Sequence, residues 1–139
     1  MDEALAAAYR AADYLAWVEP AEWARLAPDR PLPPALQAVV GEAAWGFVTA
    51  CNPRSERCTD EENRAAQREL LAALRRHPAT VRVLPAIGLG GDGWHEPSLF
   101  VVGPDTAALD ALMRRFGQHA YLHGRGDAPA RLRWTPPAG

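Results

Sequence analysis

The sequence predicts an α+β fold, a ferredoxin-like split βαβ sandwich with a βαββαβ core that starts at about residue 45. From Trp45 onward the expected elements follow the order strand, helix, strand, strand, helix, strand. The strands expected around Trp45 and Ser98 are apolar on both faces, which is typical of interior strands. A third strand contains Pro85, which favours a sheet edge. The strand order of this topology, 4-1-3-2, places all three strands as their patterns require.

The size and composition predict one soluble domain. The chain has 139 residues, with 48% hydrophobic and 23% charged side chains. We expect residues 1–43 to form a helix-strand-helix extension packed on the core. Residues 44–134 would hold the core and a short last strand, and residues 135–139 would form a frayed tail.

Charge and hydropathy restrict the classes of partner. The net charge of −2 lacks the basic excess that general nucleic-acid binding requires. The N-terminus has no signal-peptide pattern, and no stretch approaches the roughly 18 apolar residues of a membrane-spanning helix. We therefore expect a cytoplasmic protein without membrane association.

The extension contains three expected elements. Ala-rich residues 3–10 predict a short helix, and residues 14–18 predict a strand that Pro20 stops. A second short helix is expected from Pro34 to about Val40, because proline is favoured at the first helical position. The expected apolar face of the first helix consists of Leu5, Ala8 and Tyr9.

The first core strand is expected from Trp45 to Cys51. Side chains alternate between its two faces, so Trp45, Phe47, Thr49 and Cys51 share one face and Gly46, Val48, Ala50 and Asn52 the other. The small side chains of the second face suit the close approach of packed helices. Asn52 and Pro53 then form a turn.

The helix that follows has a strong start signal. Thr59 and Glu62 form a capping box, with Thr59 at the N-cap, and the helix is expected to reach about His77. Helical spacing from the apolar residues of its inner face places the amides of Gln67 and Asn63 on that same face.

The second half of the core repeats the pattern. Strands are expected at residues 81–87 and 98–102, joined by a glycine-rich turn. Asp105 is expected to cap a helix that ends with Gly117 at the C′ position. Strands from Gln118 to about His123 and over residues 131–134 complete the prediction.

The split βαβ topology gathers polar residues at one end of the sheet. The end of the first strand, the start of the first helix, the hairpin and the end of the second helix all meet there. We therefore expect a ligand-binding site at this end, made of Asn52, Arg54, Glu62, Asn63, Trp94, Glu96 and Gln118.

These residues also carry a resemblance that covers most of the chain. The segments Phe47–Pro53, Glu62-Asn63, Trp94–Ser98 and Phe116–Gln118, with Tyr9 and the Asp13-Tyr14 pair, resemble a family of small bacterial domains of unknown function. Its signature is F-x-T-A-x-N-P, E-N, W-x-E-x-S and F-G-Q. The resemblance implies no activity, and Cys51 stands where the family often has an aromatic residue.

Each candidate residue also has a purely structural interpretation. Asn63 would tie the Asn52 turn to the helix, and the capping box accounts for Glu62. Glu96, held extended before Pro97 and beside Trp94, is either a general acid or base with a raised pKa or a strand-end hydrogen-bond acceptor.

Metal, redox and phosphate sites are weaker hypotheses. His95 and His119 lie near the same end, but their spacing matches no established metal motif. Cys51 and Cys58 match neither a CxxC pair nor a zinc pattern. The run Gly88–Gly93 lacks the following helix and Lys-Ser/Thr pair of a phosphate loop, so it predicts a flexible hairpin. No cofactor is expected.

Three functions remain open. The first is a binding domain for a small polar molecule, a nucleotide or an amino-containing metabolite, because amides with one stacking ring suit recognition. The second is an enzyme with Glu96 as general acid or base. The third is a protein-interaction module in which the polar cluster is structural.

Overall fold

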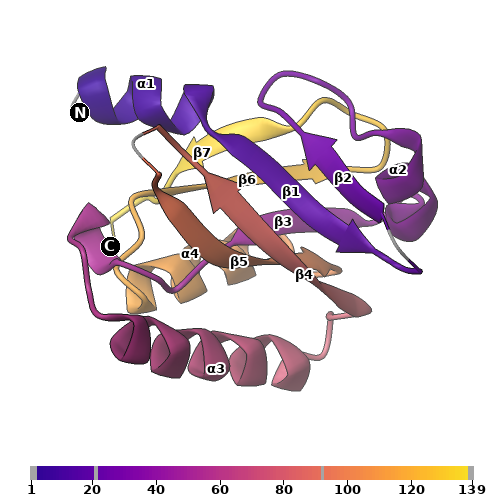
Figure 1. Cartoon of the computed structure of the whole chain (residues 1–139). Coiled ribbons are helices and arrows are strands. Elements are labelled where there is room, and N and C mark those ends of the chain that lie inside the picture. Colours follow the sequence, from indigo (N-terminus) through magenta and orange to yellow (C-terminus); the bar gives the residue numbers. More distant parts are fainter. Residues whose placement is uncertain (1–2, 21, 92, 138–139) are drawn as a thin grey trace.

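The computed structural model describes residues 3–20, 22–91 and 93–137 (Figure 1). Within these residues the protein has four α-helices and a curled, seven-stranded antiparallel sheet. The helices are α1 (Glu3–Ala11), α2 (Pro34–Val40), α3 (Asp60–Arg76) and α4 (Thr106–Arg115). The strands are β1 (Asp13–Val18), β2 (Glu22–Leu26), β3 (Ala44–Val48), β4 (Arg82–Leu89), β5 (His95–Val102), β6 (Ala120–Arg125) and β7 (Arg131–Trp134). None of the described helices is long and apolar enough to cross a membrane.

The strands follow the order β2-β1-β4-β5-β3-β6-β7. The four strands that lie between β1 and β7 in the sheet therefore stand in the order that the topology argument predicted. The sheet extends beyond them at both edges, with β1 and β2 beside β4 and with β7 beside β6.

The prediction that the Pro85 strand lies at a sheet edge is wrong. β4 is an interior strand between β1 and β5. Its pairing with β1 runs from Leu89 to Ala86 and stops before Pro85, whereas Pro85 lies opposite Leu99 of β5. Proline has no N–H to donate, so it is tolerated where the ladder on one side has ended.

The prediction of a helix-strand-helix extension at the N-terminus missed one strand. A second strand, β2, precedes α2 and pairs with β1 along its whole length. Its sequence does alternate, since Ala24 and Leu26 are buried while Glu22, Trp23 and Arg25 are exposed. β1 and β2 thus join the main sheet as an antiparallel pair.

The first core strand is shorter than predicted, ending at Val48 instead of Cys51. After Val48, side chains take the place of the backbone partners that a neighbouring strand would provide. The Ala50 N–H donates to Oε1 of Gln67 at 2.6 Å, and the Cys51 N–H donates to the Thr49 hydroxyl at 3.0 Å. The inward amide of Gln67, predicted from helical spacing, has this role.

Two further strands differ in their bounds. β5 begins at His95 instead of Ser98, because the hairpin with β4 stays paired up to Leu89 and His95. β6 covers Ala120–Arg125 instead of residues 118–123. The Gln118 N–H donates to the Met113 carbonyl, so Gln118 still belongs to the end of α4.

α3 and α4 cover one face of the sheet (Figure 1). Leu70 and Leu74 of α3 and Leu109 and Met113 of α4 pack there against Val48. Gly46 lies on the same face, where an added Cβ would be 2.5 Å from Cδ1 of Leu109. The small-residue face predicted for this strand therefore does allow close approach of a helix.

The other face of the sheet is concave and has its own core. Trp45, Phe47 and Phe100 point into it and pack with Leu36 and Val40 of α2. The curl brings the two ends of the sheet together. In the loop after β2, the Asp29 N–H donates to the Ala130 carbonyl at 2.7 Å. The Ala130 N–H in turn donates to the Arg30 carbonyl at 2.8 Å.

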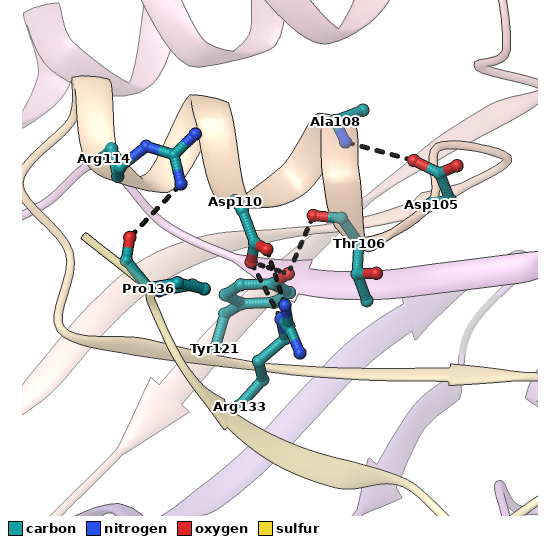
Figure 2. A network of polar contacts seen from close by, with 8 residues as sticks. All are labelled: Asp105, Thr106, Ala108, Asp110, Arg114, Tyr121, Arg133 and Pro136. Carbon is teal, nitrogen blue, oxygen red and sulfur yellow. Dashed lines mark hydrogen bonds and ion pairs between the residues drawn. The ribbon is translucent and has the colours of Figure 1, made fainter. Parts of the chain in front are cut away.

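A buried carboxylate links the last strand to α4 (Figure 2). Asp110 of α4 is 5% exposed and accepts hydrogen bonds from the Tyr121 hydroxyl at 2.7 Å and from Nε and Nη2 of Arg133 at 2.9 and 2.7 Å. The Arg133 guanidinium, and then the Tyr121 hydroxyl, lower the pKa of Asp110 despite its burial. This network fixes β7 against the helix layer.

Candidate functional site

A cleft of about 430 Å³ lies at the end of the sheet where the sequence predicts a site. One wall is α1, with Ala8 and Ala11 among its lining residues. The opposite wall is the β4–β5 hairpin with Trp94, and the floor includes Glu96 and Gln118. The volume lies within the range of small-molecule sites, which usually combine apolar walls with a few convergent polar groups.

The turn after β3 is strained and fixed by side chains. Asn52 adopts a left-handed backbone conformation (φ 49°, ψ 61°), which asparagine tolerates better than most residues. Its N–H donates to Oδ1 of Asn63 at 2.9 Å, and Nδ2 of Asn63 donates back to Oδ1 of Asn52 at 3.0 Å. The Cys58 N–H also donates to Oδ1 of Asn52, at 2.9 Å. Asn63 therefore ties the turn to α3.

Glu96 is held on the floor of the cleft by the same turn. Nδ2 of Asn52 donates to Oε2 of Glu96 at 3.0 Å. Burial raises the pKa of Glu96, and the hydrogen bond from Asn52 opposes this shift only in part. Among the described residues, no donor reaches the other carboxylate oxygen, Oε1, which leaves it available to a ligand.

Gln118 lies at the end of α4 and is 8% exposed. Its Nε2 donates to the carbonyl oxygens of Cys51 at 2.9 Å and Phe116 at 3.2 Å. In the described part of the chain its Oε1 has no donor. The amide is thus fixed by the turn, with its acceptor end left unused.

Aromatic residues border the carboxylate. The Tyr14 hydroxyl donates to the Tyr9 carbonyl, and both phenols line the cleft. Burial is the main cause that raises the pKa of each phenol, and the charge of Glu96 adds to both shifts. Both tyrosines are therefore uncharged at neutral pH. The guanidinium of Arg57 lies 5.0 Å from the ring centre of Trp94.

The structure brings four of the seven candidate binding residues to this cleft: Asn52, Trp94, Glu96 and Gln118. The other three lie outside its lining. The side chain of Arg54 is 68% exposed, and its Nη2 lies 3.8 Å from Oε2 of Glu56. Glu62 completes the predicted capping box with Thr59. Asn63 lies behind Asn52 and contacts it directly.

The weaker metal and thiol candidates are His95, His119, Cys51 and Cys58. His95 is exposed, and its Nδ1 contacts the Gly93 carbonyl at 3.2 Å. His119 is half-buried. Cys51 is buried, which raises its pKa to about 11, so its thiol is protonated at neutral pH. The described residues contain no group of three or more His, Cys, Asp or Glu side chains that could hold a metal ion.

The contribution of the N-terminus to the site was not predicted. Tyr9, Tyr14 and Ser55 line the cleft, together with the apolar face of α1. The helical face with Leu5, Ala8 and Tyr9 was visible in the sequence. What places it over the site is the pairing of β1 with β4, in which Tyr14 lies opposite Gly88, and no local sequence pattern specifies such a long-range partner.

Comparison with known families matches residues 48–121, more than half of the chain, to a protein of unknown function (DUF3293). No curated protein and no solved structure matches the chain. The matched segment runs from the end of β3 into β6 and contains Asn52, Trp94, Glu96 and Gln118. The α1 wall of the cleft precedes it.

Proposed function

This chain belongs to the DUF3293 family of proteins of unknown function, and we propose that it binds a small polar molecule in the cleft beside α1. One observation carries the proposal: Glu96 and Gln118, from different elements, converge on one cleft and each keep an oxygen that no donor of the described residues reaches. Neither oxygen is among the fully buried unpaired polar atoms, so each can pair with water or with a ligand donor. The ligand classes that the sequence suggests are a nucleotide and an amino-containing metabolite.

A structural role for the whole cluster is the less favoured alternative. It fits Asn63, whose amide is fully used within the protein, and Glu62, which completes the helix cap. It does not account for Glu96, whose half-buried carboxylate lines the cleft and has no cation partner among the described residues. The protein-interaction function therefore has less support than ligand binding.

An enzymatic function with Glu96 as general acid or base is the second candidate. The raised pKa of this carboxyl group favours it, because a group that titrates nearer neutrality transfers protons more readily at physiological pH. Asn52 would then orient the carboxylate and Gln118 the substrate. Ligand binding is the simpler proposal, since it requires no reacting partner.

The fold supports two finer proposals. The order and antiparallel pairing of β4, β5, β3 and β6, with both following helices on one face, support a ferredoxin-like core. One hydrophobic cluster combines Tyr14 and Leu36 of the N-terminal segment with Phe47 and Phe100. This shared cluster supports a single domain over the chain.

A thermal-shift screen tests the binding proposal. Nucleotides, amino acids, amines and metal ions are added to the wild type and to Ala8→Trp, which fills the cleft from an exposed position of α1. The matched control is Ala111→Trp, at an exposed position of α4 that does not line the cleft. We expect a ligand-induced rise in melting temperature in the wild type and the control that Ala8→Trp abolishes. Equal responses of both tryptophan variants would place binding elsewhere.

A further inference from the structure

We infer that the ligand of this cleft carries a protonated amino group on an apolar body, an inference that rests on the proposed function. It goes beyond that proposal by selecting a cation over a nucleotide. Three properties of the lining lead to it: its charge, its hydrogen-bonding capacity and its apolar wall.

The lining is acidic. Among the described residues that border the cleft, Glu96 is the only charged one, and no arginine or histidine joins it. Arg57 contacts the Trp94 ring but is not part of the lining, and Arg54 faces Glu56 instead. A phosphate group would therefore meet a carboxylate without a neutralising cation, whereas an ammonium group would meet its natural partner.

Several polar atoms of the lining are acceptors, while Tyr9 and Ser55 contribute hydroxyl groups that hydrogen-bond to each other. Oε1 of Glu96 and Oε1 of Gln118 have no donor within the described chain. The Tyr14 hydroxyl gives its proton to the Tyr9 carbonyl, so its oxygen is also left to accept. Three acceptors on one cleft match an ammonium group, which has three donors and no acceptor. Asn52 uses one of the two N–H groups of its Nδ2 on Glu96.

The remaining lining suits an apolar body. Leu5, Ala8 and Ala11 of α1, followed by Ala12 just after the helix, form one wall, where the alanine side chains leave room beside the helix. Tyr9 and Trp94 border the same space, and aromatic faces attract cations as well as apolar groups. A bare ammonium ion would make no use of this apolar wall.

The electrostatic environment of Glu96 also favours a cationic ligand. The charge of Glu96 acts on Tyr9, Tyr14 and Cys51 from neighbouring elements, and the pKa values of all three are raised, so each is uncharged at neutral pH. Burial therefore disfavours the charged form of Glu96 with only Asn52 to oppose it. A bound ammonium group would supply the missing counter-charge.

Calorimetric titration with matched probes tests the inference. The probes are butylamine, hexylamine, phenethylamine and tryptamine, each beside the alcohol of the same carbon skeleton, with AMP as the nucleotide. We expect at least one amine to bind tenfold or more tightly than its alcohol. Glu96→Gln should remove that preference, because a hydrogen bond to a charged group typically contributes a factor of about ten to a hundred. Glu56→Gln, an exposed glutamate outside the lining, should retain it.

The other outcomes separate the inference from the proposed function. Ala8→Trp keeps Glu96 and should lose amine binding by occlusion, which guards against a folding defect in Glu96→Gln. Binding of AMP that Ala8→Trp abolishes would refute the amine class and leave the binding site intact. Equal affinity for amines and alcohols, or no amine binding at millimolar concentration, would also overturn the inference. If the thermal-shift screen found no ligand of any class, the proposed binding function itself would be refuted.

Discussion

Nδ2 of Asn52 donates a 3.0 Å hydrogen bond to Oε2 of Glu96, which joins two segments 44 residues apart at the floor of the cleft. The other end of the Asn52 amide is occupied by Nδ2 of Asn63 and the Cys58 N–H. Asn52 is thus a positioning residue, and Glu96 is the group it positions. A half-buried carboxylate that has no cation partner among the described residues costs folding free energy.

Glu96→Gln should stabilise the protein at pH 7. Glutamine keeps an acceptor for Asn52 and removes the half-buried charge. Relief of an unfavourable functional group commonly raises the free energy of unfolding by about 0.5–2 kcal/mol. Urea denaturation of the wild type and the variant measures the difference. Glu56→Gln, at an exposed position, should change it by less than about 0.5 kcal/mol. A clear loss of stability in Glu96→Gln would mean that its carboxylate has a structural role.

The stabilisation by Glu96→Gln should depend on pH. The folded-state pKa of Glu96 is raised above its ordinary value of 4.5, so the folded state binds more protons than the unfolded state between the two pKa values. The wild type therefore loses stability relative to the variant as pH rises from about 4.5, and the difference levels off above the folded pKa. Urea titrations from pH 3.5 to pH 8 follow this change. A constant difference across that range contradicts the prediction.

Asn63→Ala should destabilise the fold without removing a ligand contact. The substitution leaves the Asn52 N–H without its acceptor and Oδ1 of Asn52 with one donor fewer. An unpaired buried group costs about 1–3 kcal/mol. Arg64→Ala, at the next and exposed position of α3, is the matched control. Amine binding measured well below the melting temperature should persist in Asn63→Ala, and its complete loss in a folded variant would place Asn63 in the binding site.

Local patterns in the sequence were sufficient for much of the core. Strand alternation separated Trp45 and Phe47 from Gly46 and Val48, and the two hydrophobic clusters contain these groups on opposite faces of the sheet. The capping box at Thr59 was read from residue types at fixed spacing. These features depend on side-chain periodicity and on hydrogen bonds within one turn, so they are encoded locally.

The missed features depend on contacts between distant segments. Pro85 has the local signature of an edge residue, yet β1 pairs with the same strand and stops one residue away. The α1 wall needs the pairing of Tyr14 with Gly88, which neither segment specifies alone. The convergence of Asn52, Glu96 and Gln118 at one end of the sheet could be predicted because these residues follow the core topology. Its full lining was not, because α1 reaches it through the unpredicted pairing of β1.

Asp110→Asn tests the network that fixes β7 to α4 (Figure 2). Asparagine cannot accept the paired bonds of Arg133 as a carboxylate does, and the Arg133 side chain is 36% exposed, so we expect a loss of about 2 kcal/mol. The pKa of Asp110 is lowered, so its stabilising contribution should be present above the ordinary value of 3.8 and fade as pH falls through the folded value. Urea denaturation at pH 7 and pH 3 measures both effects. Asp127→Asn, in an exposed turn, should show neither.

Gly46→Ala tests the close approach of α4 to β3. An added Cβ would be 2.5 Å from Cδ1 of Leu109, which is fully buried, so the leucine must move within a packed core. Such overpacking costs about 1–3 kcal/mol. Gly91→Ala is the control, because a Cβ there meets nothing within 4 Å. Leu109→Ala alone should leave a cavity, and in the double variant Gly46→Ala should cost much less than in the wild type. If Gly46→Ala costs the same in both backgrounds, Leu109 is not what restricts this position to glycine.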